Sequence, residues 1–197
     1  PTFNDLYYPG DNNPNLKPER TENTEVFVEY VNDMQTSRLT GYHTDAEDLI
    51  ASGTNISEAK IKGLSLTSDW NMSAFIFGLG YDYLDAKNKT KTNANFDQQL
   101  PYRPKNSGLV YIGYQQPMFD MRLEAKYSDD RLTTENNELD SYTLLNLSGS
   151  AYITPNLRAN LRVDNITDED YTLASQFGNE YATEGTSYFT TLTYKWY

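Results

Sequence analysis

The chain has 197 residues and a formal net charge of −12, from 16 Lys and Arg against 28 Asp and Glu. This acidic balance, without a basic stripe, argues against nucleic acid as a partner. Because the chain has no cysteine, disulfide frameworks, thiolate metal sites and cysteine nucleophiles are excluded.

The rest of the composition favours a folded chain rich in β-structure. Hydrophobic residues make up only 38%, yet 17 Tyr bring the aromatic content to 14%, and disordered segments are depleted in aromatic residues. The sequence has no run of about 18 apolar residues, so no transmembrane helix is predicted. The opening PTFNDLYYPG has no signal-peptide features. We therefore expect a mature or excised piece of a longer protein.

Period-two alternation predicts about nine strands of roughly ten residues each. In the segment 119–127, apolar residues such as Met121 and Leu123 alternate with charged residues such as Arg122 and Glu124. The charged face must meet water. In chain order, the predicted strands are 22–30, 36–45, 58–70, 74–84, 105–114, 119–127, 141–153, 157–164 and 187–196.

The connections between these strands alternate strictly between short and long. A soluble β-sandwich or propeller would explain the alternation within strands, but it has no reason to sort its loops by end. An outer-membrane barrel does sort them, with short periplasmic turns and long outer loops. The sequence therefore predicts an all-β, antiparallel, up-and-down transmembrane β-barrel. The predicted short turns lie near 31–35, 69–73, 115–118 and 154–156, and the long loops near 46–57, 85–103, 128–140 and 167–186.

Three spaced segments carry a family likeness. They are NPNLKPERTENTEVFVEY at 13–30, DNITDEDY at 164–171 and EGTSYFTTLTYKW at 184–196. Together they resemble segments of TonB-dependent outer-membrane receptors. The likeness departs from the family pattern at residues 166–167, where Ile-Thr replaces Leu-Phe, and at Thr186, where Arg is usual.

Within that family, three further segments resemble the cobalamin receptors. They are EAKIKGLSLTSDW at 58–70, YDYLDAKN at 81–88 and LPYRPKNSGLVY at 100–111. The resemblance implies a barrel of twenty-two strands around an N-terminal plug. Residues 1–197 would be its C-terminal part, without the plug and the N-terminal strands.

The resemblance also implies a location and partners. The protein would lie in the bacterial outer membrane, in contact with its lipid. It would bind cobalamin or another scarce nutrient outside the cell. Uptake would be energised by TonB through the N-terminal part, and barrel-assembly machinery would insert the protein. Two alternatives remain open: a siderophore (ferric chelate) receptor of the same family, and a passive porin or surface binding protein.

Candidate catalytic and metal-binding residues are few. His43 is the only histidine, so a His-based triad or metal site would depend on one residue. The acidic clusters, for example Asp164 with Asp168, Glu169 and Asp170, do not match the loop spacing of a calcium-binding EF-hand. We therefore predict no enzyme activity, no cofactor and no metal site.

Ligand capture is expected at the long loops, because a large polar ligand needs flat rings and convergent hydrogen-bond donors. The same residue types also occur as solvated loop residues and as interfacial aromatics, and that interpretation stays open for each one. The candidate ligand-binding residues are Tyr102, Arg103, Arg131, Phe177, Asn179 and Tyr181.

The last predicted strand has an apolar face that ends one residue before the C-terminus. Its even-numbered residues are expected to face lipid, and the resemblance implies that barrel-assembly machinery recognises the final aromatic residue of that face. The residues expected to serve assembly are Tyr188, Leu192, Tyr194 and Trp196.

Replacing Trp196 with Ala should therefore impair barrel assembly far more than replacing Tyr197, which follows out of phase. The measurement is the amount of folded, heat-modifiable barrel in the outer membrane. Equal effects of the two substitutions would reject the assignment of the even-numbered residues to the lipid face.

Overall fold

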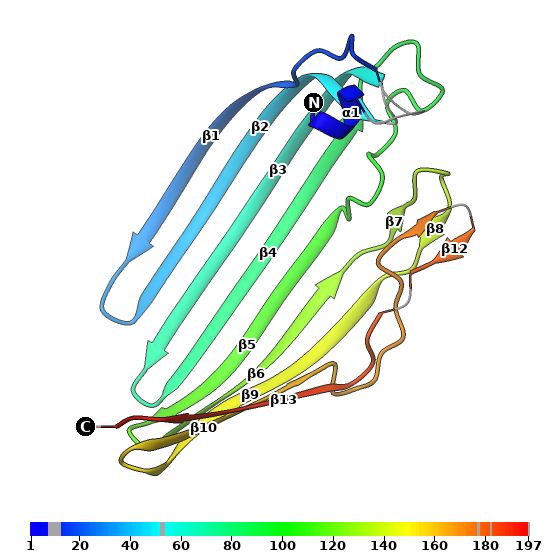
Figure 1. Cartoon of the computed structure of the whole chain (residues 1–197). Coiled ribbons are helices and arrows are strands. Elements are labelled where there is room, and N and C mark those ends of the chain that lie inside the picture. Colours follow the sequence, from blue (N-terminus) through cyan, green and yellow to red (C-terminus); the bar gives the residue numbers. More distant parts are fainter. Residues whose placement is uncertain (8–12, 52–53, 177, 182, 197) are drawn as a thin grey trace.

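Nine strands pair in chain order to form one antiparallel sheet (Figure 1). The computed structural model describes residues 1–7, 13–51, 54–176, 178–181 and 183–196. The predicted nine strands are confirmed. They are β1 (Arg20–Val31), β2 (Gln35–Ala51), β3 (Thr54–Met72), β4 (Phe75–Asn88), β5 (Asn106–Gln116), β6 (Phe119–Ser128), β9 (Tyr142–Thr154), β10 (Leu157–Asp164) and β13 (Ser187–Tyr194).

The remaining elements are short and lie in the long connections or before the first strand. They are the helix α1 (Phe3–Tyr7), the ribbon of β7 (Arg131–Leu132) with β8 (Glu138–Leu139), and the ribbon of β11 (Ser175–Gln176) with β12 (Asn179–Glu180). Among the described residues, no helix is long and apolar enough to cross a membrane.

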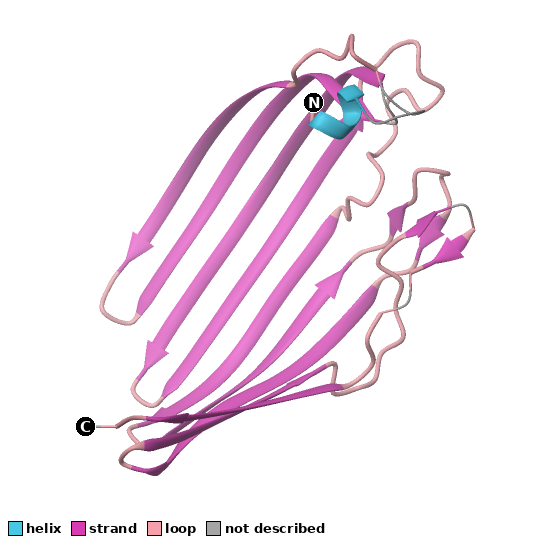
Figure 2. Ribbon diagram, viewed as in Figure 1, coloured by secondary structure: helices cyan, strands magenta, loops and turns pink. Residues whose placement is uncertain are grey.

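The sheet is curved and open, and β1 and β13 form its two edges within the described chain (Figure 2). Its register places apolar side chains in rows on one face. One such row crosses β1 to β4 through Val28, Leu39, Leu66 and Tyr81. Val28 is 71% exposed, although it belongs to this apolar row. An exposed apolar band on alternating residues is the arrangement of a barrel wall facing lipid.

A conventional hydrophobic core is lacking in the described residues, which excludes the soluble sandwich. Such a sandwich would bury the inner faces of two sheets against each other. Here the buried hydrophobic residues are few and mostly small: Leu16, Ala46, Ala59, Ala86 and Leu139.

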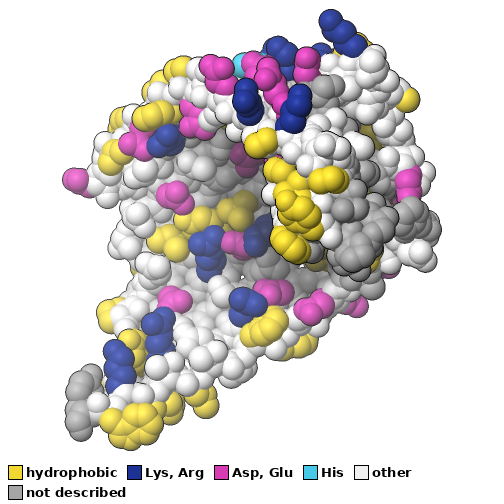
Figure 3. Space-filling view, turned by 45° about the horizontal axis from the view of Figure 1, so that its top comes forward, with side chains coloured by type: hydrophobic (Ala, Val, Ile, Leu, Met, Phe, Trp, Pro, Cys, Tyr) yellow, Lys and Arg dark blue, Asp and Glu magenta, His cyan; other side chains and the backbone are white. Residues whose placement is uncertain are grey.

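The opposite face of the sheet is polar and held by charged contacts. Arg122 lies 3.5 Å over the ring of Tyr111 and donates to Glu124 at 2.7 Å, and Lys126 pairs with the same carboxylate at 3.1 Å. Figure 3 shows basic and acidic side chains lying next to one another on the hollowed side of the molecule. This face therefore suits water or a polar occupant.

The prediction of a long loop near 46–57 is wrong. Strands β2 and β3 continue as a ribbon, with Leu49 paired to Ile56 and Ala51 paired to Thr54. The ribbon is paired through its backbone and forms without the period-two alternation of the other strand segments. Asp48 has a φ of 55°, in the left-handed region. Because the segment lacks the period-two pattern and is mostly polar, its sequence predicted a loop.

The even-numbered residues of the last strand share one face as far as Tyr194. Tyr188 pairs with Val163, Leu192 with Ala159, and Tyr194 with Leu157, so the even-numbered residues share the apolar face of β10. The strand ends at Tyr194 rather than at Trp196, whose ring lies 5.0 Å from that of Tyr194. Tyr197 lies outside the described residues.

One tyrosine on the polar face requires a glycine on the neighbouring strand. The ring of Tyr111 crosses β4 at Gly78, where an added Cβ would lie 1.9 Å from a ring carbon. The hydroxyl of Tyr111 donates to Asp69 on β3 at 2.5 Å. The absence of a side chain at Gly78 lets this ring lie flat across the sheet.

Gly78→Ala should therefore lower the free energy of unfolding by about 1–3 kcal/mol, the usual cost of overpacking. Chemical unfolding of the full-length protein in detergent micelles would measure it. Gly80→Ala is the matched control on the same face of β4, because its Cβ would meet its nearest atom at an ordinary 3.8 Å. Equal losses for the two variants would contradict this account of Tyr111.

Candidate functional site

The long connections gather at one end of the sheet, and the short turns lie at the other end with the C-terminus (Figure 1). Because successive strands are antiparallel, every second connection returns to the same end. Three loops form the candidate site: the first loop (89–105), the second loop (129–141) and the third loop (165–186).

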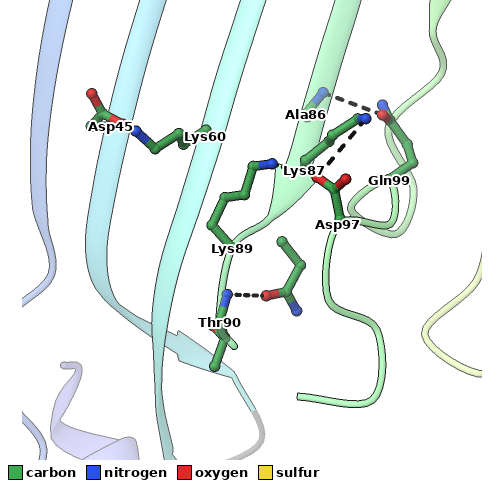
Figure 4. A network of polar contacts seen from close by, with 9 residues as sticks. Asp45, Lys60, Ala86, Lys87, Lys89, Thr90, Asp97 and Gln99 are labelled. Carbon is green, nitrogen blue, oxygen red and sulfur yellow. Dashed lines mark hydrogen bonds and ion pairs between the residues drawn. The ribbon is translucent and has the colours of Figure 1, made fainter. Parts of the chain in front are cut away.

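The first loop is held against β4 by ion pairs and hydrogen bonds (Figure 4). Asp97 accepts a short hydrogen bond from Lys89 and lies 3.9 Å from the ammonium of Lys87. The backbone N–H of Ala86 donates to the side-chain oxygen of Gln99 at 3.2 Å. These contacts tie the middle of the loop to the strand from which it leaves.

Three more contacts organise the same corner, and Figure 4 draws Thr90, Lys60 and Asp45 among the residues that make them. Thr90 donates its backbone N–H to the side chain of Asn88 at 2.9 Å, and its hydroxyl accepts from the N–H of Glu58 at 3.1 Å. Lys60 on β3 pairs with Asp45 on β2 at 3.1 Å. The start of the first loop is thus fixed to both β3 and β4.

Arg131 lies inside the loop cluster, only 5% exposed. Its guanidinium donates to the backbone oxygen of Thr172 in the third loop, and to the hydroxyl of Ser128 at 3.4 Å. It also lies 5.1 Å from the ring centre of Tyr142. This predicted ligand residue therefore joins the second loop to the third.

Tyr102 joins all three loops. Its backbone N–H donates to the oxygen of Leu132 at 2.7 Å, and its hydroxyl donates to the backbone oxygen of Ser175 at 2.5 Å. Its φ of 56° is in the left-handed region, which is uncommon for a bulky residue. The side chains of Tyr102 and Arg131 thus both donate to backbone oxygens of the third loop.

The other predicted ligand residues lie nearer the solvent. Arg103 is exposed, and so are Asn179 in β12 and Tyr181, which is 57% exposed. The backbone N–H of Tyr181 donates to Ala174 at 2.9 Å, which fixes the chain direction there. Phe177 lies outside the described residues.

A polar hollow of about 250 Å³ lies between the second and third loops. Carboxylates contribute much of its lining. No group of three His, Cys, Asp or Glu residues in the described chain is arranged to hold a metal ion. The residues lining the hollow are Glu138, Leu139, Asp140, Ser141, Asp170, Tyr171, Thr172 and Glu180.

The two ends of the third loop are tied to each other by a clasp, defined as Asn165, Asp168, Gly185 and Thr186. Asp168 accepts from the backbone N–H of Thr186 at 3.0 Å, and the hydroxyl of Thr186 donates to the backbone oxygen of Asn165 at 2.8 Å. Sequence reasoning did not find this contact. The available signal was that DNITDEDY and EGTSY flank the same predicted loop.

Among the groups in the loops with shifted pKa values are Asp97 and Tyr171. The hydrogen bond from Lys89 is the main cause that lowers the pKa of Asp97, helped by the charges of Lys87 and Lys89. Burial raises the pKa of Tyr171, and Tyr142 and Glu184 act in the same direction. Asp97 therefore stays ionised, and the ion pairs of the first loop persist, throughout the neutral range.

A curved antiparallel sheet with an apolar outer face, a polar inner face and long loops at one end defines the wall of an outer-membrane type of β-barrel. Sequence comparison gives the family. A family profile described as "TonB dependent receptor-like, beta-barrel" matches residues 1–166. The chain belongs to this family of TonB-dependent receptors, whose members are outer-membrane transport receptors.

Two curated relatives align with nearly the whole chain. "Vitamin B12 transporter BtuB" of Photobacterium profundum is 34% identical over 212 residues, and the protein of the same name from Vibrio vulnificus is 29% identical over 206 residues. Each alignment covers 99% of this chain and 33% of the relative. The chain therefore spans about a third of the length of these relatives.

Solved structures support the fold alone. The ferric yersiniabactin uptake receptor FyuA from Yersinia pestis matches with a TM-score of 0.82 at 14% identity, over 91% of this chain and 30% of that one. The copper transporter OprC matches with a TM-score of 0.77 at 19% identity, over 93% and 32%. Identities this low carry no information about the ligand.

The ion pairs of Asp97 should make the order of the first loop dependent on acid. Because its folded pKa is lowered, these contacts stabilise the folded loop above the unfolded value of 3.8 and are lost as the pH falls below it. Amide-exchange protection in the first loop, corrected for intrinsic rates, should be constant from about pH 7 to about pH 5 and fall below 3.8.

Asp97→Asn should lower that protection at neutral pH and remove its acid dependence. The control is Asp33→Asn, in a short turn at the other end of the sheet. An unchanged profile in Asp97→Asn would show that the ion pairs do not hold the loop.

Proposed function

We propose that this chain is the C-terminal part of an outer-membrane receptor that takes up cobalamin by TonB-energised transport. The observation that carries the proposal is 34% identity, over 99% of the chain, to a curated vitamin B12 transporter. The siderophore alternative has weaker support, because the structural neighbours with that function are too distant in sequence to indicate a ligand.

In this proposal the chain supplies barrel wall and outer loops only. The plug and the segment that contacts TonB belong to the part of the receptor outside residues 1–197. The apolar face of the sheet meets outer-membrane lipid. Tyr188, Leu192, Tyr194 and Trp196 present the last strand to the barrel-assembly machinery. The ligand is moved and not chemically changed.

The loop contacts divide the five predicted ligand residues that the structure describes into two groups. Arg103, Asn179 and Tyr181 are exposed and would contact the ligand directly through charge, amide and ring. Tyr102 and Arg131 would act indirectly, because their polar groups are already used to hold the third loop. Cobalamin is a large polar ligand with flat rings and many amides, which suits this mixture of donors and aromatic surface.

The function is tested by binding to the full-length protein. Isothermal titration with cyanocobalamin and with a panel of ferric siderophores would identify the ligand. Tight cyanocobalamin binding, with uptake that requires TonB, supports the proposal. Tight binding of a ferric siderophore without cyanocobalamin binding would replace it by the siderophore alternative.

Arg103→Ala should weaken cyanocobalamin binding by about tenfold or more, the usual effect of losing one charge-assisted hydrogen bond. Lys195→Ala is the matched control, because it removes the same charge at the opposite end of the sheet. Titration with each folded variant gives the dissociation constant. Equal constants for the two variants would remove Arg103 from the site.

A further inference from the structure

We propose that the clasp positions the third loop for ligand capture, with Asp168 and Thr186 as positioning residues that do not touch the ligand. This inference rests on the proposed function. Its structural part, that the clasp holds the loop, can be tested without a ligand.

The clasp joins the end of β10 to the start of β13 across a long loop. Asp168 Oδ1 accepts from the backbone N–H of Thr186 and also lies 3.5 Å from the hydroxyl of Thr186. That hydroxyl donates to the backbone oxygen of Asn165, 21 residues earlier in the chain. The ends of the loop are therefore bonded directly above the last strand pair.

Asn165 builds the first half of the clasp and is only 3% exposed. Its side chain donates to the backbone oxygen of Glu169 and accepts from the N–H of Glu169, both at 2.9 Å. Its own N–H donates to Asn146 on β9 at 3.0 Å. Asn165 and Asp168 have φ values of 51° and 52°, a region that Asn and Asp tolerate better than most residues.

Gly185 builds the second half by leaving space for the carboxylate. A Cβ at this position would lie 2.5 Å from Asp168 Oδ1, which is closer than real contacts allow. The sequence Gly-Thr at 185–186 therefore has two linked roles. The glycine admits the carboxylate, and the threonine donates to it.

Above the clasp the loop folds back on itself toward the exposed candidate residues. The hydroxyl of Thr183 donates to the backbone oxygen of Tyr171 at 2.6 Å, and the N–H of Tyr181 donates to Ala174 at 2.9 Å. Ser175 pairs with Glu180 in the β11–β12 ribbon. The direction in which Tyr181 projects therefore depends on where the two ends of the loop are held.

Holding the ends of the loop lowers the cost of binding. A loop with open ends would sample many placements of Asn179 and Tyr181 and would lose that freedom when a ligand binds. Preorganisation removes this cost before binding. Opening the clasp should therefore weaken ligand binding while the nine-stranded sheet, which has its own ladder of bonds, stays intact.

The experiment uses the full-length receptor and two pairs of matched variants. Asp168→Ala removes the acceptor, whereas Asp168→Asn keeps an oxygen in its place. Thr186→Val removes the hydroxyl at nearly constant shape, whereas Thr186→Ser keeps it. Gly185→Ala is a fifth variant, which displaces the carboxylate without changing it.

Three quantities are measured for each variant: the heat-modifiable folded fraction, amide-exchange protection in the third loop, and the dissociation constant for cyanocobalamin per folded molecule. We expect Asp168→Ala, Thr186→Val and Gly185→Ala to lose loop protection and to bind about tenfold more weakly. Asp168→Asn and Thr186→Ser should stay close to the wild type in loop protection and in the dissociation constant.

Unchanged loop protection in Asp168→Ala and Thr186→Val would overturn the inference. Lost protection with unchanged affinity per folded molecule would also overturn it, because the clasp would then serve only the fold. If a variant assembles poorly, its folded fraction is purified and the other four variants decide. If the wild type binds a ferric siderophore and no cyanocobalamin, the proposed function fails, and the same comparison with that siderophore tests the clasp.

Discussion

The structure depends on the ladder of backbone hydrogen bonds between neighbouring strands. No hydrophobic core holds the sheet together within the described residues, and the few buried apolar residues are mostly alanines. The ladder satisfies the backbone within each strand pair, so rows of apolar side chains can line the outer face without a core behind them. Exposed apolar side chains are favourable where the surroundings are lipid. Lipid offers the backbone no hydrogen-bond partners, so the ladder between strands must satisfy every backbone group there.

The two faces of the sheet use side chains in different ways. On the apolar face, rows such as Val28, Leu39, Leu66 and Tyr81 contribute surface for lipid. On the polar face, Arg122 is held between a tyrosine ring and a carboxylate. At the loop end, similar polar contacts join segments that are distant in sequence. Most specific positioning in this chain therefore comes from polar and aromatic contacts.

Much of the fold could be predicted from the sequence, because lipid on one side and water on the other impose a period of two on each strand. The prediction failed at 46–57, where β2 and β3 continue as a ribbon but the period-two pattern disappears. The site was less predictable. Residue type alone could not distinguish Arg131 as a ligand contact from Arg131 as a buried link to Thr172. The bond between Asn165 and Thr186 joins residues far apart in sequence, and no local pattern encodes it.

The linking roles of Tyr102 and Arg131 have a consequence for how the loops move. Tyr102 bonds to Leu132 and Ser175, and Arg131 bonds to Thr172, so no one of the three loops can leave its place without breaking bonds to another. Such segments open as one cooperative unit. A molecule that binds only the third loop would therefore also reduce the motion of residues near Tyr102, just before β5, although it does not contact them.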